Sequence, residues 1–106
     1  MPAKDDVYAN IESVANDAYM TIRPADGAEA VITYITVAGG GKCIVSHYDG
    51  TNEAAIMDLS AAGGDAMPFA GQGFPVTYTD YLRVQNKSGS AAVIMGYAGY
   101  YTKAAS

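Results

Sequence analysis

The chain has 106 residues, a net charge of −5 and a single cysteine, Cys43. Its length corresponds to one domain. A single cysteine excludes an intrachain disulfide. The net negative charge argues against nucleic acid or an anionic membrane as a partner. Only 16% of the residues are charged, whereas soluble domains average about 25%. We therefore expect a protein partner to cover part of the surface.

The first residues are polar and mixed, and we assign residues 1–16 to an N-terminal arm that precedes a β-sandwich domain at residues 17–106. A short helix and an irregular arm fit this segment equally well, because short helices are marginal on their own. The apolar residues that would share one helix face are Val7, Ile11, Val14 and Ala15. No apolar signal core or membrane span is visible, so we expect a protein made in a cytoplasm.

From residue 17 onwards the apolar residues recur with a period of two, which predicts β-strands. The predicted strands are residues 18–23, 29–37, 42–48, 54–59, 76–79, 81–86 and 91–101. Residues 60–75 are rich in glycine and alanine and are expected to form a long loop. About seven strands separated by short turns predict an all-β fold, an antiparallel β-sandwich with a jelly roll as one candidate topology. The predicted core positions are Val31, Ile35, Ile44, Leu82, Val84 and Ile94.

The residue types that carry out catalysis are scarce in this chain. The only cysteine and the only histidine, Cys43 and His47, are four residues apart in a predicted strand. Four residues of strand separate them by roughly 13 Å, so they cannot act as a Cys–His pair. We expect a buried thiol and a histidine beside a turn, and we expect no catalytic residue, cofactor or metal site. The aspartates lack the calcium-loop spacing, and the glycines before Lys42 lack the phosphate-loop pattern.

Tyrosine is unusually abundant, with nine copies and no tryptophan. Tyrosine offers a large contact area at low entropic cost, which suits subunit or sugar contacts, although about half of these residues are expected only to form strands. The predicted interface residues are Met67, Phe69 and Phe74 in the 60–75 loop and Tyr97, Tyr100 and Tyr101 near the C-terminus. We expect the arm and this loop to make the contacts. The alternative is that the two phenylalanines fold back and close one end of the sandwich.

Residues 79–86, a short Ser/Gly turn and residues 92–97 resemble the closing hairpin of small β-sandwich virion proteins of tailed bacteriophages, the head decoration (cement) type. The segment His47-Tyr48-Asp49-Gly50-Thr51 fits the same style. This resemblance extends over residues 17–101 in pattern and implies no catalytic residues. It implies a structural subunit of a virion.

Together these observations predict a non-enzymatic virion subunit that clamps neighbouring copies of the major capsid protein or of another virion protein. We expect a homo-oligomer, with a trimer as the first arrangement to consider. A tail, neck or fibre component is the alternative within the same class. A carbohydrate-binding module is the alternative from a different class, and a hydrolase is the third, because no acid–base pair stands out.

Overall fold

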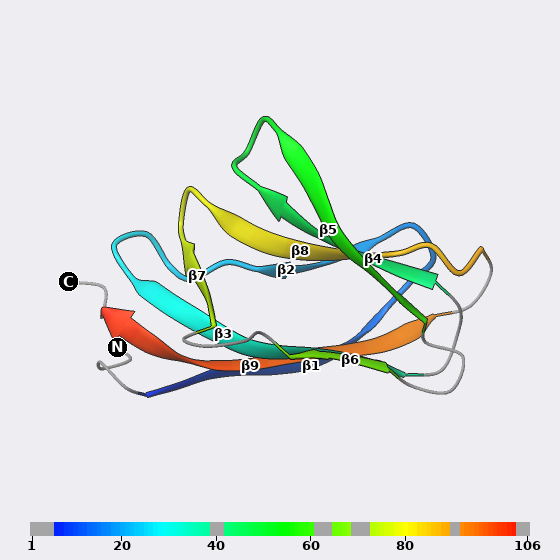
Figure 1. Ribbon diagram of the computed structural model, residues 1–106, viewed down its shortest axis with the longest axis horizontal. Helices are drawn as coiled ribbons and strands as arrows, with labels where there is room; N and C mark the ends of the chain where they lie inside the picture. Colours follow the sequence, from blue (N-terminus) through cyan, green and yellow to red (C-terminus); the bar gives the residue numbers. More distant parts are fainter. Residues whose placement is uncertain (1–5, 39–41, 61–64, 69–72, 90–91, 104–106) are drawn as a thin grey trace.

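Two antiparallel β-sheets face each other in the computed structural model, which describes residues 6–38, 42–60, 65–68, 73–89 and 92–103 (Figure 1). All regular elements of these residues are strands. The strands are β1 (Val7–Val14), β2 (Tyr19–Ile22), β3 (Glu29–Ala38), β4 (Lys42–Tyr48), β5 (Glu53–Ser60), β6 (Asp65–Pro68), β7 (Phe74–Thr77), β8 (Tyr81–Asn86) and β9 (Val93–Lys103). The predicted all-β sandwich is confirmed.

The order of the strands is that of a jelly roll. The five-stranded sheet runs β1-β9-β3-β6, with β7 also paired to β3, and the four-stranded sheet runs β2-β8-β4-β5. The first strand therefore pairs with the last, β2 with β8, β3 with β6 and β7, and β4 with β5. These nested pairs are what results when one long hairpin is wrapped into two sheets, as in jelly rolls. Strands β6 and β7 together take one position in this scheme.

The core lies between the two sheets and is built from the inward side chains of both. Cys43 of β4 and Leu59 of β5 belong to this core, and every other strand whose side chains are described also contributes residues to it. Its largest fully buried side chains are Met20, Ile22, Ile32, Ile35, Leu59, Leu82 and Met95. Burial of this apolar surface is the main driving force for the fold, since no disulfide is available.

A β-bulge in the middle of β3 reverses which residues face inward. Ala30 and Ile32 are buried before it, whereas Ile35 and Val37 are buried after it, because the register with β9 shifts between Ile32 and Tyr34. One extra residue in a strand moves every following side chain to the other face. The hydroxyl of the bulged Thr33 donates a hydrogen bond to the carbonyl oxygen of Ala98 at 3.0 Å.

Only some of the predicted core residues are correct, and the bulge accounts for the difference between Ile35 and Val31 in β3. Ile35, Leu82 and Val84 are fully buried, as expected. Val31 and Ile44 are only half-buried, and the prediction for Ile94 is wrong because 55% of this residue is exposed. Both faces of β3 and β9 carry apolar residues, so alternation alone could not identify the inward face.

Two further expectations are corrected by the strand pairing. Residues 7–14 are neither a helix nor an irregular arm, because β1 pairs with β9 over its full length. A boundary after residue 16 therefore does not separate an arm from the sandwich. Residues 60–75 are not a single loop, because β6 and the start of β7 lie inside them and pair with β3.

Asn86 is the polar residue that ties the two sheets together at one end of the sandwich. It is completely buried. Its side-chain amide donates to the carbonyl oxygen of Val14 at 2.9 Å, and its side-chain oxygen accepts from the backbone N–H of Ser88 at 2.9 Å. Its backbone N–H donates to Ala18 and its carbonyl oxygen accepts from Asp17. The end of β8 is thereby bonded to the β1–β2 connection.

We expect Asn86→Ala to lower the free energy of unfolding by about 1–3 kcal/mol, since it leaves the buried carbonyl of Val14 without this donor. Urea denaturation followed by circular dichroism would measure this. Gln85→Ala is the matched control, because the Gln85 amide binds the carbonyl oxygen of Asp17 at an exposed position. Equal losses for the two variants would contradict a special role for Asn86.

Candidate functional site

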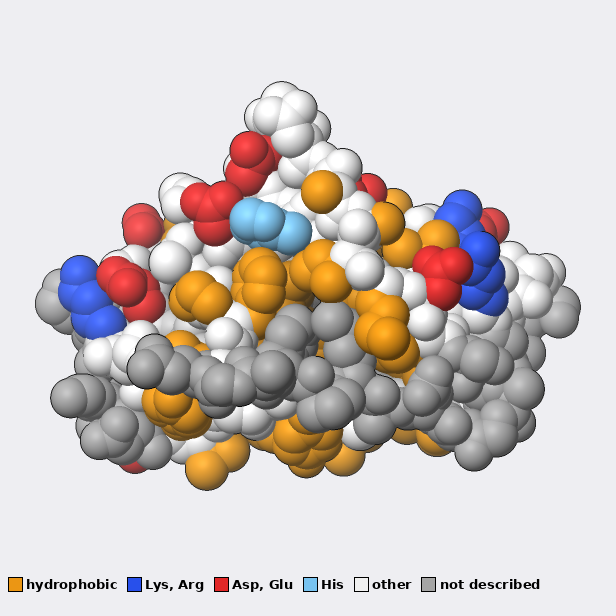
Figure 2. Space-filling view, in the orientation of Figure 1, with side chains coloured by type: hydrophobic (Ala, Val, Ile, Leu, Met, Phe, Trp, Pro, Cys, Tyr) orange, Lys and Arg blue, Asp and Glu red, His pale blue; other side chains and the backbone are white. Residues whose placement is uncertain are grey.

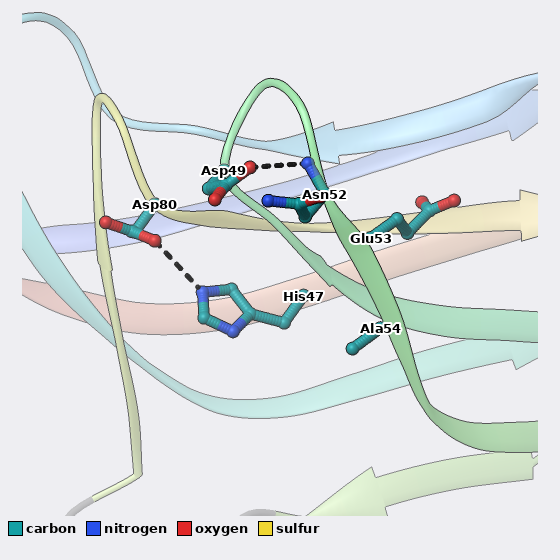
Figure 3. Close-up of a pocket in the computed structure, with 6 residues that line it drawn as sticks. All are labelled: His47, Asp49, Asn52, Glu53, Ala54 and Asp80. Atoms are coloured by element: carbon teal, nitrogen blue, oxygen red, sulfur yellow. Dashed lines mark hydrogen bonds and ion pairs between the residues drawn. The ribbon is translucent and has the colours of Figure 1, made fainter.

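A concave pocket lies between the β4–β5 hairpin and the β7–β8 turn (Figure 3). Its volume is about 180 Å³. The lining residues are His47, Asp49, Asn52, Glu53, Ala54 and Asp80. The local sequence explains this shape, because the Asp-Gly dipeptide at residues 49–50 turns β4 into β5 and Gly50 has a φ of 96°.

The acidic groups of the pocket already have partners within the chain. The Asp49 carboxylate accepts hydrogen bonds from the backbone N–H groups of Asn52 at 2.7 Å and of Thr51 at 2.9 Å, and these bonds hold the pKa of Asp49 below its usual value. Asp80 lies 3.4 Å from Nε2 of His47. Glu53 accepts a 2.6 Å hydrogen bond from Nε of Arg83. The carboxylates thus stabilise turns and strand ends.

The described residues that line this pocket with His47 include no serine, threonine or cysteine. The His47 ring packs edge-on against Phe74, with ring centroids 5.4 Å apart. The Cys43 thiol is completely buried in the core, and burial raises its pKa, which disfavours the thiolate. In the part of the chain that the structure describes, no group of three or more His, Cys, Asp and Glu side chains is placed to hold a metal ion. The same residues include no helix long and apolar enough to cross a membrane.

A second candidate site is the outward face of the five-stranded sheet, which we call the apolar face. In β1, Tyr8 and Val14 are buried and the odd-numbered residues are exposed, and in β9, Val93, Met95 and Tyr97 are buried while Ile94 and Tyr100 are exposed. One set of side chains of each strand therefore lies on this face. The strand register aligns them in rows, for example Val7, Tyr100 and Val31. The apolar face consists of Val7, Ala9, Ile11 and Ser13 from β1, Val31, Tyr34, Thr36 and Ala38 from β3, and Ile94, Gly96, Ala98 and Tyr100 from β9.

The apolar face is unusually hydrophobic for a surface. The exposed fractions are 76% for Val7, 75% for Ile11 and 55% for Ile94. Figure 2 shows hydrophobic side chains along the lower edge of the view, where Figure 1 places this sheet. None of the described residues that make up the face is charged, and the nearest ion pair, Lys103 with Glu29 at 3.9 Å, lies at the end of the sheet. Contiguous apolar patches of this kind mark protein contact sites.

The outward face of the four-stranded sheet has the opposite character, because arginine and tyrosine side chains stack on it. The guanidinium of Arg83 lies 3.8 Å from the ring centroid of Tyr48 and 4.1 Å from that of Tyr19. Arg23 lies 3.7 Å from the ring centroid of Tyr78 and donates from Nε to the Tyr78 carbonyl oxygen at 2.7 Å. A guanidinium therefore covers one side of each of these rings, which leaves fewer open ring surfaces for a stacked sugar.

The three tyrosines predicted for the interface lie in different environments. Tyr100 belongs to the apolar face. Tyr97 is only 8% exposed and packs in the core, with its ring centroid 5.2 Å from that of Tyr8, and Tyr101 packs against the same ring at 5.0 Å. Burial and a hydrogen bond with Tyr97 raise the pKa of Tyr8. Since the chain itself covers Tyr97, this residue is corrected from an interface to a core position.

The three residues predicted from the 60–75 segment are also separated. Phe74 packs against the core and His47, as in the alternative in which the phenylalanines fold back. The backbone of Met67 pairs with Ile35 in β6, and Phe69 lies outside the described residues. The exposed residues Val7 and Ile11 lie in the arm that was expected to make contacts, but they were not predicted individually, although a spacing of four places residues on one face of a strand as well as of a helix.

Comparison with known proteins leaves the family open. No protein-family model and no curated protein matches the chain. Among solved structures, PirA is similar with a TM-score of 0.48 and 9% identity, over 88% of this chain and 93% of PirA. The capsular polysaccharide assembling protein CapF from Staphylococcus aureus has a TM-score of 0.40 and 12% identity, over 92% of this chain and 25% of CapF. A 3,4-ketoisomerase from Helicobacter canadensis has a TM-score of 0.38 and 16% identity, over 88% of this chain and 59% of that protein.

Proposed function

We propose that this protein is a non-catalytic structural subunit that works by contact with other protein subunits. The apolar face carries this proposal, because a monomer that exposes Val7, Ile11 and Ile94 to water on one face of a sheet is stabilised when a partner covers them. The pocket at His47 also supports the proposal that the protein is non-catalytic. The Asp49 and Glu53 carboxylates are held by a turn and by Arg83, and the described residues that line the pocket beside the His47–Asp80 pair include no serine, threonine or cysteine for this pair to activate.

The assembly that we propose is the virion of a tailed bacteriophage, with the protein as a head decoration subunit. The support for this context is the sequence resemblance of residues 79–86 and 92–97 to decoration proteins. The hairpin that this resemblance implied is not formed, because β8 and β9 lie in different sheets. A subunit that binds the assembled capsid and not its free parts stabilises the assembled state, by about 2.7 kcal/mol per site when its concentration is 100 times the dissociation constant. A tail, neck or fibre position would use the same contact chemistry.

The test is mass spectrometry of purified virions grown from the genome that encodes this chain. We expect the chain in a fixed ratio to the major capsid protein, and antibody labelling in electron micrographs on the head. Labelling confined to the tail would favour the alternative position. Absence of the chain from purified virions, despite its synthesis in infected cells, would contradict a virion role.

A further inference from the structure

We propose that a second copy of this chain covers the apolar face, so that two copies pack five-stranded sheet against five-stranded sheet. This inference deepens the proposed function, because it rests on assembly through protein contacts and names the partner of one face.

The charge distribution favours a second copy over a charged partner. The chain carries a net charge of −5, so two copies repel each other across most of their surfaces. The apolar face is the exception, since its described side chains are all uncharged and its nearest ion pair is internal. A charged partner would lose hydration there without gaining a counter-charge. An identical uncharged face has no charged group that would lose its hydration in the contact.

The rows of the apolar face combine projecting and small side chains. The register places Tyr34 beside Ala98 and Ala9 in one row, and Ile11 beside Gly96 in the next. Stacked sheets lie about 10 Å apart and interdigitate their side chains. In a two-fold symmetric pair each copy presents both projecting and small side chains to its partner. We therefore expect the projecting residues of one copy to pack against the small residues of the other.

The area of the face suffices for a weak contact. Three strands about 4.8 Å apart and about eight residues long, at about 3.4 Å per residue, cover roughly 400 Å². Two copies would therefore bury roughly 800 Å² in total, which is in the range of weak, transient interfaces. We accordingly expect a dissociation constant well above about 1 µM.

A two-fold pair replaces the trimer that composition suggested. One contiguous face satisfies itself about a two-fold axis, whereas a ring of three requires two different contact patches on each subunit. In the pair, the two Arg- and Tyr-bearing faces of the four-stranded sheets point in opposite directions. Such a particle could contact two neighbouring subunits at once, which is what a clamp requires.

Sedimentation velocity of the purified chain at concentrations from about 1 to 200 µM tests the pairing. We expect an 11.0 kDa species to convert into a species of twice that mass as the concentration rises. The double variant Ile11→Glu/Ile94→Glu should weaken pairing at least about 100-fold, because it buries unpaired charge. The matched control is Thr21→Glu/Ala55→Glu, which adds the same charge at exposed positions of the four-stranded sheet and should pair like the wild type.

Methyl NMR of the unaltered chain gives a second measurement that does not depend on how a variant folds. The signals of Ile11 and Ile94 should shift with concentration, whereas Ile56, which is 40% exposed on β5, should not. A wild-type chain that remains monomeric at 200 µM overturns the inference. Pairing that survives the double variant, or that shifts only Ile56, overturns it as well.

The outcomes separate this inference from the proposed function. A monomeric chain that still binds virions, and loses binding in the Ile11→Glu/Ile94→Glu variant, would assign the apolar face to the capsid and refute the second copy alone. A pair that is absent from virions would refute the virion role and leave the pairing intact.

Discussion

Replacing Gly99 with alanine should destabilise the protein by at least about 3 kcal/mol, the largest effect that we expect from a single methyl group. A Cβ atom at this position would lie 1.9 Å from the carbonyl oxygen of Val31 and 2.9 Å from Cα of Ile32. Both are backbone atoms of β3 next to the bulge, so neither can rotate away. The β3–β9 pairing must open locally to admit the methyl group.

Thermal and urea unfolding followed by circular dichroism would measure this loss. Gly96→Ala is the matched control on the same strand, where the added atom would meet Cγ1 of Ile11 at 3.0 Å and the carbonyl oxygen of Asn10 at 3.1 Å. The side chain of Ile11 can shift, and β1 is an edge strand, so we expect a loss of about 1 kcal/mol or less. If Gly99→Ala proved as stable as Gly96→Ala, the close approach of β3 and β9 would be wrong.

The second large effect is expected for Leu82→Ala, which should lower the free energy of unfolding by about 2–5 kcal/mol. Leu82 is completely buried in β8, between its partners Ile22 in β2 and His47 in β4. Truncation removes buried apolar surface and leaves a cavity that two paired neighbours prevent from collapsing. Urea denaturation should show a lower midpoint with an unchanged slope.

Ile94→Ala is the control for this prediction, since it removes a similar side chain from the apolar face. At about 1 µM, where the proposed pair is dissociated, we expect Ile94→Ala to cost less than about 0.5 kcal/mol. At concentrations that favour the pair, the same variant should lose additional stability. Equal losses for Leu82 and Ile94 at low concentration would mean that Ile94 is a core residue, as the sequence first indicated.

The class of fold followed from local properties of the sequence. Short alternating segments ended by glycine and aspartate turns predicted the strands at residues 29–37, 42–48 and 81–86, and all three are present. These features are local because a strand and a turn each depend on a few consecutive residues. The burial of Cys43 and the position of His47 beside a turn were predictable for the same reason.

The tertiary structure decided which side of each strand became the core. In β3 both alternating sets are apolar, and the bulge at Thr33 transfers the inward position from one set to the other. That bulge depends on the approach of β9 from more than sixty residues away, where Gly99 permits close contact. A local pattern cannot contain this information, because bulges and registers are properties of paired strands.

The candidate contact surface was decided in the same way. Composition alone indicated that a partner covers part of this low-charge chain, and the sequence indicated the arm at residues 1–16, the tyrosines and the 60–75 segment as the place. Only the pairing of β1 with β9 brings Val7 and Ile11 beside Tyr100 and Ile94 into one apolar face, and only the packing against Tyr8 withdraws Tyr97 from the surface. The amount of exposed apolar surface depends on composition, whereas its location depends on contacts between residues far apart in the chain.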